Sequence, residues 1–266
     1  MRHLKIFLAL LTLTTPSFAA LPFVTDDAGT ANKNQLVLEE FTEQWHLPKK
    51  NEEKASNLIG QYAGLSYGLT ERLELGVGGL AAYDFTNKSL AVMNPIVQLK
   101  SIIFKPKNPE VPAFALSAGY VTNNGQGQYY DNATNYYLIG IFTTHLFDDN
   151  LIMHVNTGPK ASYGLPIGGN LHRIQLGVAI DAALFRKDIR LFAESYNGTP
   201  NSPRDSPGLF HSYQTGFKWI KSDSLAFNIL YGSQPTFAGY DANQESLYRR
   251  TSTIQIGVRK VWDNFF

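Results

Sequence analysis

Apolar residues recur at every second position along most of this chain, and this alternation constrains its fold more than any other feature. In the segment 171–184, for example, Ile174, Leu176, Val178 and Ile180 alternate with residues that are polar or small. A period of two is typical of β-strands that have one apolar face and one polar face. Clusters of Gly, Pro, Asn and Asp separate the segments, as expected of turns and loops. The pattern predicts an all-β fold.

The alternation divides the chain into twelve predicted strands. They span residues 34–46, 57–69, 72–84, 92–104, 111–122, 134–146, 150–163, 171–184, 188–198, 209–220, 224–234 and 250–263. Short connections at 70–71, 148–149, 186–187 and 221–223 take turns with longer polar ones near 47–56, 85–91, 123–133, 164–170, 199–208 and 235–249, and the connection 105–110 is intermediate. Short turns at one end and long loops at the other are typical of an antiparallel up-and-down barrel.

The first predicted strand fits the alternation poorly. Glu39 and Glu43 share a phase with Val37, Phe41 and Trp45, so that neither face of this strand is purely apolar. The sequence leaves the register of this strand open.

A soluble barrel or sandwich points its apolar face inward and a transmembrane barrel points it outward, and alternation alone does not distinguish the two. The polar face of this chain is rich in charge, and each charge buried in a dry interior would cost several kcal/mol. A water-filled lumen removes this cost. The charged residues on the polar face are Glu74, Lys100, Arg173, Asp181, Arg190, Glu194, Lys218 and Arg259. Their number favours the transmembrane barrel.

Aromatic residues and the last strand also favour the membrane. Near the strand ends, where Tyr and Trp suit the lipid headgroup level, lie Tyr67, Tyr83, Tyr120, Tyr213, Trp219, Tyr231 and Trp262. Phe265 and Phe266 follow an alternating strand, which resembles the assembly signal of bacterial outer-membrane barrels, although Lys260 and Asn264 interrupt the phase. Charged residues make up only 17% of the chain, against about 25% in soluble domains. We therefore expect a bacterial outer-membrane barrel whose partners are the lipid bilayer and the outer-membrane assembly machinery.

The first residues have the pattern of an export signal. Arg2, His3 and Lys5 precede an apolar run at residues 6–13, and Ser17 and Ala19 fit the small residues before a cleavage site. The apolar run is too short to span a bilayer. We predict a signal peptide at residues 1–19, an N-terminal segment at 20–33 and a barrel at 34–266.

Two stretches of sequence resemble a known family. Residues 21–30 read LPFVTDDAGT, and residues 67–78 read YGLTERLELGVG around a predicted turn. Both are similar to the outer-membrane transporter family named for the MetA pathway of phenol degradation. The resemblance implies an outer-membrane channel, in some members linked to uptake of aromatic compounds, and it carries no catalytic motif.

The residues of these stretches also suggest local structure. Gly68 is predicted to allow a tight turn, with a left-handed backbone if the turn requires one. The segment with Thr25, Asp26 and Asp27 is either a periplasmic tail or a plug that pairs with basic residues in the lumen.

We expect a passive channel or facilitated transporter for a small solute. Mixed charge at a constriction selects polar solutes by dipole and size, whereas Phe192 and Tyr196, on the same face, are suited to stacking with an aromatic or hydrophobic solute. The predicted lumen residues are Glu74, Lys100, His154, Arg173, Gln175, Asp181, Arg190, Glu194, Gln214, Lys218 and Arg259.

Several other functions find little support. The formal net charge is +1 and no basic run indicates a nucleic-acid partner. Without Cys there is neither a thiol nucleophile nor a Cys-based zinc site, and Asp26 with Asp27 supplies too few ligands for calcium. No motif pairs a nucleophile with a base, so we expect no enzyme activity, no metal and no cofactor. Two alternatives stay open: a surface-interaction barrel whose long loops bind a partner, and a lipid-active outer-membrane enzyme.

Overall fold

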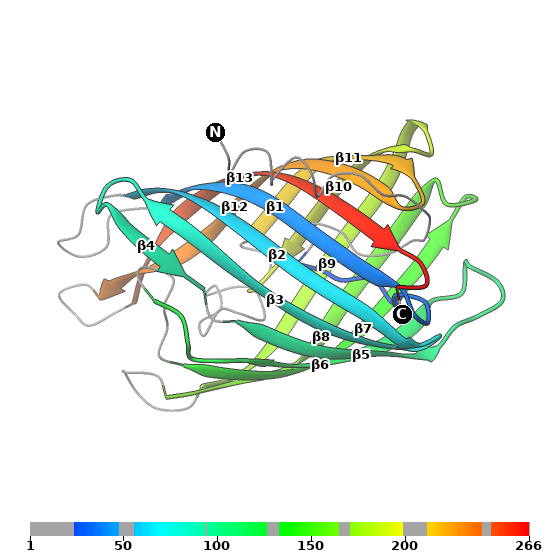
Figure 1. Cartoon of the computed structure of the whole chain (residues 1–266), viewed down its shortest axis with the longest axis horizontal. Helices are drawn as coiled ribbons and strands as arrows, with labels where there is room; N and C mark the ends of the chain where they lie inside the picture. The colour runs from blue at the N-terminus through cyan, green and yellow to red at the C-terminus, as the bar shows by residue number, and fades with distance from the viewer. Residues whose placement is uncertain are drawn as a thin grey trace.

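The computed structural model describes residues 24–47, 56–93, 95–126, 133–164, 171–198, 212–240 and 246–265. Within these ranges the chain forms thirteen strands in one antiparallel sheet, and twelve of them close into a barrel (Figure 1). The predicted signal peptide at 1–19 lies outside the described residues. No helix among the described residues is long and apolar enough to cross a membrane.

Each long strand pairs with its neighbours in sequence, and the first pairs with the last. The strands are β1 (Leu36–Leu47), β2 (Ser56–Thr70), β3 (Leu73–Asp84), β4 (Ser89–Val92), β5 (Ile96–Phe104), β6 (Ala113–Val121), β7 (Thr134–Leu146), β8 (Leu151–Tyr163), β9 (Leu171–Arg186), β10 (Ile189–Tyr196), β11 (Ser212–Ser222), β12 (Leu225–Tyr240) and β13 (Ser246–Trp262). Pairing of β1 with β13 closes the barrel, and β4 pairs with β3, while Val92 at the end of β4 forms a bridge with Gln126. The predicted fold, a twelve-stranded antiparallel barrel, is confirmed.

Both ends of the barrel sheet lie at the short-turn end. Leu36 at the start of β1 is opposite Trp262 at the end of β13, and the Phe265 N–H donates to the Asn34 carbonyl at 2.9 Å. In Figure 1 this end is on the right, where the C-terminus is marked. This arrangement follows from an even number of strands joined by alternating short and long connections.

Two predicted boundaries are wrong. The segment 92–104 is not one strand: β4 ends at Val92 and β5 begins at Ile96, because Pro95 lacks the N–H that a strand ladder needs. The predicted loop 235–249 is mostly strand, since β12 continues to Tyr240 and β13 begins at Ser246. Apolar residues alternate along a strand where one of its faces contacts an apolar environment. The ends of β12 and β13 form a two-stranded extension beyond such an environment, so their sequence does not alternate.

Most of the exposed apolar residues lie on the outer face of the barrel, and most of its charged strand residues lie on the inner face. Ile174 and Ile256 are 69% and 61% exposed, whereas Lys100 and Arg190 are only 2% and 3% exposed. Many other apolar strand residues on the outer face are exposed, and the aromatic residues Tyr83, Tyr120, Tyr213, Trp219 and Tyr231 are among them. Closed pairing satisfies the backbone groups of the wall, as a surface in contact with lipid requires.

Strand β1 mixes the two kinds of residue on both faces. Glu39, Phe41, Glu43 and Trp45 point into the lumen, so that aromatic rings and carboxylates share the inner face. On the outer face, Gln61 of β2 donates to Glu40 at 3.1 Å and accepts from Thr42 at 2.7 Å. The alternation was ambiguous here because aromatic residues lie inside and polar residues outside.

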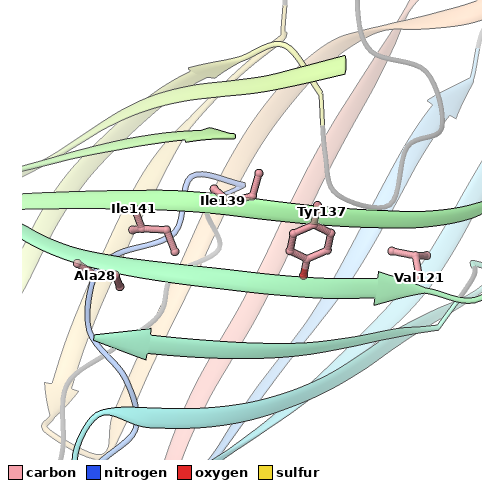
Figure 2. Close-up of a cluster of buried hydrophobic side chains, with 6 residues drawn as sticks. Ala28, Val121, Tyr137, Ile139 and Ile141 are labelled. Carbon is pink, nitrogen blue, oxygen red and sulfur yellow. The ribbon is translucent and has the colours of Figure 1, made fainter. Parts of the chain in front are cut away.

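Glycines make room for aromatic rings on the inner wall. A Cβ at Gly119 would lie 2.0 Å from the Tyr137 ring, and one at Gly60 would lie 2.5 Å from the Trp45 ring. Tyr137 also belongs to a small apolar cluster with Ile139 and Ile141 of β7 (Figure 2). The rings can therefore lie flat against the sheet rather than fill the centre of the lumen.

Candidate functional site

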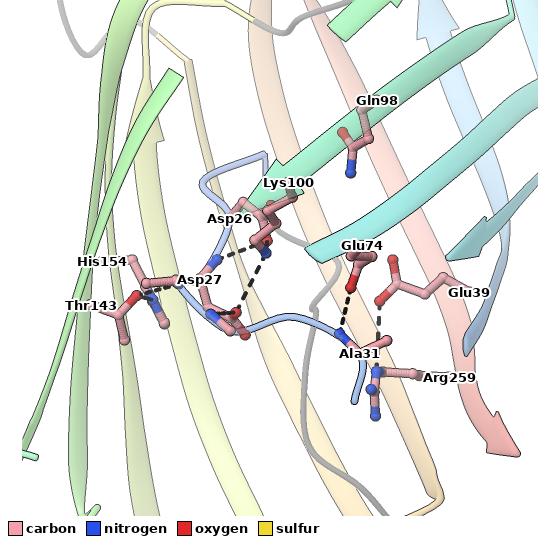
Figure 3. Close-up of polar contacts among 12 residues, drawn as sticks. Asp26, Asp27, Ala31, Glu39, Glu74, Gln98, Lys100, Thr143, His154 and Arg259 are labelled. Carbon is pink, nitrogen blue, oxygen red and sulfur yellow. Dashed lines mark hydrogen bonds and ion pairs between the residues drawn. The ribbon is translucent and has the colours of Figure 1, made fainter. Parts of the chain in front are cut away.

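The N-terminal segment runs inside the barrel. We call residues 24–35 the luminal segment; Figure 3 shows its backbone passing between the strands of the wall. At its base the Asn34 N–H donates to the Gly68 carbonyl at 2.9 Å, and the Ala31 N–H donates to Glu74 of β3 at 2.6 Å. The described part of the segment thus contacts the inner wall; its role as a plug stays a prediction.

Gly68 has a different role from the predicted one. It lies inside β2, and among the described glycines only Gly164 has a positive φ, so Gly68 does not use the left-handed backbone that glycine allows. A Cβ at Gly68 would lie 1.8 Å from the Asn32 carbonyl oxygen. Glycine is needed here because the backbone of the luminal segment passes directly against the wall.

A buried carboxylate holds the other end of the luminal segment. Glu194 of β10 accepts hydrogen bonds from the N–H groups of Val24 and Thr25, each at 2.8 Å. Its side chain also accepts from the Gln214 amide. Hydrogen bonds to a charged acceptor are stronger than neutral ones, so Glu194 is a firm anchor for the inner end of the segment.

Between these ends an ion pair and a hydrogen bond join the segment to two more strands. Lys100 of β5 lies 2.9 Å from Asp26 and 3.6 Å from Asp27. The Ala28 N–H donates to Thr143 of β7 at 2.8 Å. Burial in the lumen raises the pKa of Asp26 from 3.8 to about 6, although the Lys100 ammonium opposes this shift.

A second group of charges lies on the wall of β9, β10 and β11. Asp181 pairs with Arg190 and lies 2.8 Å from the Lys218 ammonium. Elsewhere Arg259 lies 3.9 Å from Glu39 (Figure 3), and Arg173 donates to Ser162 at 3.0 Å. His154 and Thr143 are hydrogen-bonded at 3.0 Å. Through these contacts, charged side chains of the lumen are paired with other residues of the barrel wall.

Beyond the luminal segment lies a cavity of about 330 Å³. Of the eleven predicted lumen residues, Glu74, Lys100, Gln175 and Gln214 line it. The other seven, which do not line it, are His154, Arg173, Asp181, Arg190, Glu194, Lys218 and Arg259. Tyr196 lines the cavity as well, whereas Phe192 is buried without lining it. A role of these residues toward a solute stays a prediction.

The sequence prediction missed the aromatic and acidic side of the cavity. Phe41, Glu43 and Trp45 of β1 line it together with Tyr62 and Tyr137. Phe41 and Tyr62 are stacked, with ring centroids 4.4 Å apart. The poor alternation of the first predicted strand was the available signal. It arises because the residues that face the lumen there are both aromatic and acidic.

The described side chains offer no obvious metal centre. Within the described ranges, no three His, Asp or Glu side chains cluster in a way that could hold a metal ion. The lumen provides a cavity lined by charged, polar, aromatic and aliphatic side chains.

Comparison with known proteins shows the fold. No protein-family model matches the chain, and no curated protein matches it significantly. The COG4313 outer membrane channel from Pseudomonas putida F1 aligns with 94% of this chain and 100% of its own, with a TM-score of 0.56 and 8% identity. The KdgM porin in complex with disordered oligogalacturonate aligns with 84% of this chain and 98% of its own, with a TM-score of 0.50 and 12% identity. The chain thus has the fold of outer-membrane β-barrels.

Proposed function

We propose that this chain is a non-enzymatic outer-membrane channel that passes small solutes by diffusion. The observation that carries the proposal is the inverted barrel, with apolar residues outside and a polar lumen that contains a cavity of about 330 Å³. The two solved barrels described above are an outer membrane channel and a porin, which supports the proposal. An export signal at residues 1–19 would place the barrel where such channels act.

The proposal extends to a solute class and to a family. The aromatic rings that line the cavity support a solute with an apolar or aromatic part, since such rings offer stacking surfaces. Membership of the MetA-pathway transporter family is part of the proposal and is supported by the two stretches at residues 21–30 and 67–78.

The test is planar-bilayer recording on the purified protein, together with swelling of proteoliposomes in solutions of small solutes. The proposal expects single-channel steps and solute-dependent swelling. A variant that lacks residues 20–33 serves as the control for the luminal segment and should conduct more. Absence of current and swelling in both proteins would overturn the proposal.

A second candidate is a surface-interaction barrel that binds a partner through its long loops. The position of the luminal segment inside the barrel favours it, because the segment and its partners occupy the lumen at the short-turn end. The same recordings separate the two functions, since a surface-interaction barrel would conduct neither with the segment nor without it.

A further inference from the structure

The cavity is acidic and aromatic. Among the described residues that line it, the carboxylates are Asp26, Glu39, Glu43 and Glu74, and Lys100 is the one side chain with a permanent positive charge. Its walls otherwise carry aromatic rings, amide and hydroxyl groups, and aliphatic side chains such as Leu80 and Ile139. Such a surface suits a positively charged group better than a negative one.

Three of these carboxylates have protein partners. Asp26 pairs with Lys100, Glu74 accepts the Ala31 N–H, and Glu39 lies 3.9 Å from Arg259. Their charges are already used in holding the luminal segment and the wall. They therefore add to the negative potential of the cavity without being available to bind a ligand directly.

Glu43 is different. It is only 9% exposed and lines the cavity, yet within the described part of the chain its carboxylate makes no hydrogen bond or ion pair. A buried carboxylate without a partner is costly, and in natural proteins such a group commonly has a functional reason. Its position on the inner face of β1 directs it toward the space where a solute would lie.

Aromatic residues line the cavity near this carboxylate. Trp45 is two residues further along the same face of β1. Gly60 of β2 pairs with Glu43, and Tyr62 is two residues from Gly60 on the same face of β2. Glycines hold two of these rings in place, since a Cβ at Gly60 would meet Trp45 and one at Gly78 would meet the Tyr62 hydroxyl, each at 2.5 Å. A carboxylate beside aromatic faces is the chemistry that recognises organic ammonium groups.

We propose that the cavity is a binding site for organic cations, in which Glu43 supplies the counter-charge and the rings of Trp45 and Tyr62 contact the ammonium group and its apolar body. The inference rests on the proposed function, because it names the solute class of that channel. The long-range charge of the other carboxylates favours a cation, and the rings favour one that carries an apolar or aromatic part.

The test uses three probes that share a phenyl ring and differ in charge: benzyltrimethylammonium is positive, benzyl alcohol is neutral and benzoate is negative. Their binding to the purified barrel in detergent is measured by isothermal titration calorimetry. The cation should bind at least about tenfold more tightly than the other two. Glu43→Gln should abolish this preference, whereas Glu43→Asp, which keeps the charge, should retain part of it. Glu71→Gln, in the exposed turn between β2 and β3, is the matched control and should bind like the parent protein.

Calorimetry does not depend on conduction, so the two proposals fail separately. Cation binding without any current would overturn the transport proposal and keep the site. A conducting barrel that binds the three probes equally, or whose cation preference survives Glu43→Gln, would overturn this inference alone. Folding of each variant is checked by its migration on a gel before and after heating.

Discussion

Gly68 of β2 and Asn32 of the luminal segment lie in backbone contact, with room for no side chain at position 68: a Cβ there would fall 1.8 Å from the Asn32 carbonyl oxygen. The preceding residue Tyr67 is paired on both sides, with Leu36 of β1 and Leu75 of β3, so we expect the luminal segment to yield rather than the wall. Gly68→Ala should therefore displace the base of the segment and raise single-channel conductance severalfold. Gly79→Ala is the matched control, because a Cβ at Gly79 meets nothing within 4 Å. Equal conductance in the two variants would contradict the prediction.

Lys100→Met should release the middle of the luminal segment. The substitution roughly keeps the volume of the side chain but removes the ammonium group that lies 2.9 Å from Asp26. Removing one partner of a buried ion pair typically destabilises the folded arrangement by about 3–5 kcal/mol. We expect frequent openings in single-channel records, and partial recovery of the closed level when Asp26→Asn is added. A double variant that opens as often as Lys100→Met would show that the ion pair does not hold the segment.

Docking of the luminal segment should depend on pH through Asp26. Its pKa is about 6 when the segment is docked and 3.8 when it is free, so protonation favours the docked state. This stabilisation is complete below 3.8 and is lost as the pH rises through about 6. Open time in single-channel records should therefore increase across this window. Asp26→Asn should remove this increase in open time, whereas the turn variant Asp188→Asn should keep it. A parent protein that opens more at low pH than at high pH would contradict the prediction.

Asp181→Ala should destabilise the barrel wall itself. Its carboxylate is 1% exposed and faces both Arg190 and Lys218, and its removal would leave two cations close together inside the barrel. We expect a loss of about 3–5 kcal/mol in the free energy of unfolding. Asp188→Ala removes an ion pair with Arg186, which is 72% exposed, and should cost at most about 1 kcal/mol. Urea titrations followed by gel migration compare the two, and equal midpoints would contradict the expected ranking.

The sequence predicted the barrel well because one physical requirement, an apolar outer face, repeats in almost every strand. It could not orient β1, where Phe41 and Trp45 face inward and Glu40 faces outward with Gln61 as its partner. The prediction sorted residues into two faces on the assumption that the more apolar face points outward. In β1 that assumption does not hold.

The lumen was predicted less completely than the wall. Charged residues such as Lys100 and Glu194 were identified, but their partners in the luminal segment are backbone N–H groups and carboxylates that come together only in three dimensions. Tyr62 and Tyr137 line the cavity because glycines on neighbouring strands, Gly78 and Gly119, leave room for their rings. Such a match between strands has no local signature in the sequence.

The luminal segment joins strands that are far apart around the barrel. Glu74 on β3 holds Ala31, and Glu194 on β10 holds Thr25; following the pairing order, these strands are six places apart in a ring of twelve. The two carboxylates therefore stand on opposite sides of the cross-section, and the segment between them acts as a crossbar. A thin cylindrical wall resists flattening poorly, whereas one tied across its diameter keeps its shape. Removing the crossbar would thus soften the barrel against lateral pressure from the bilayer as well as open its lumen.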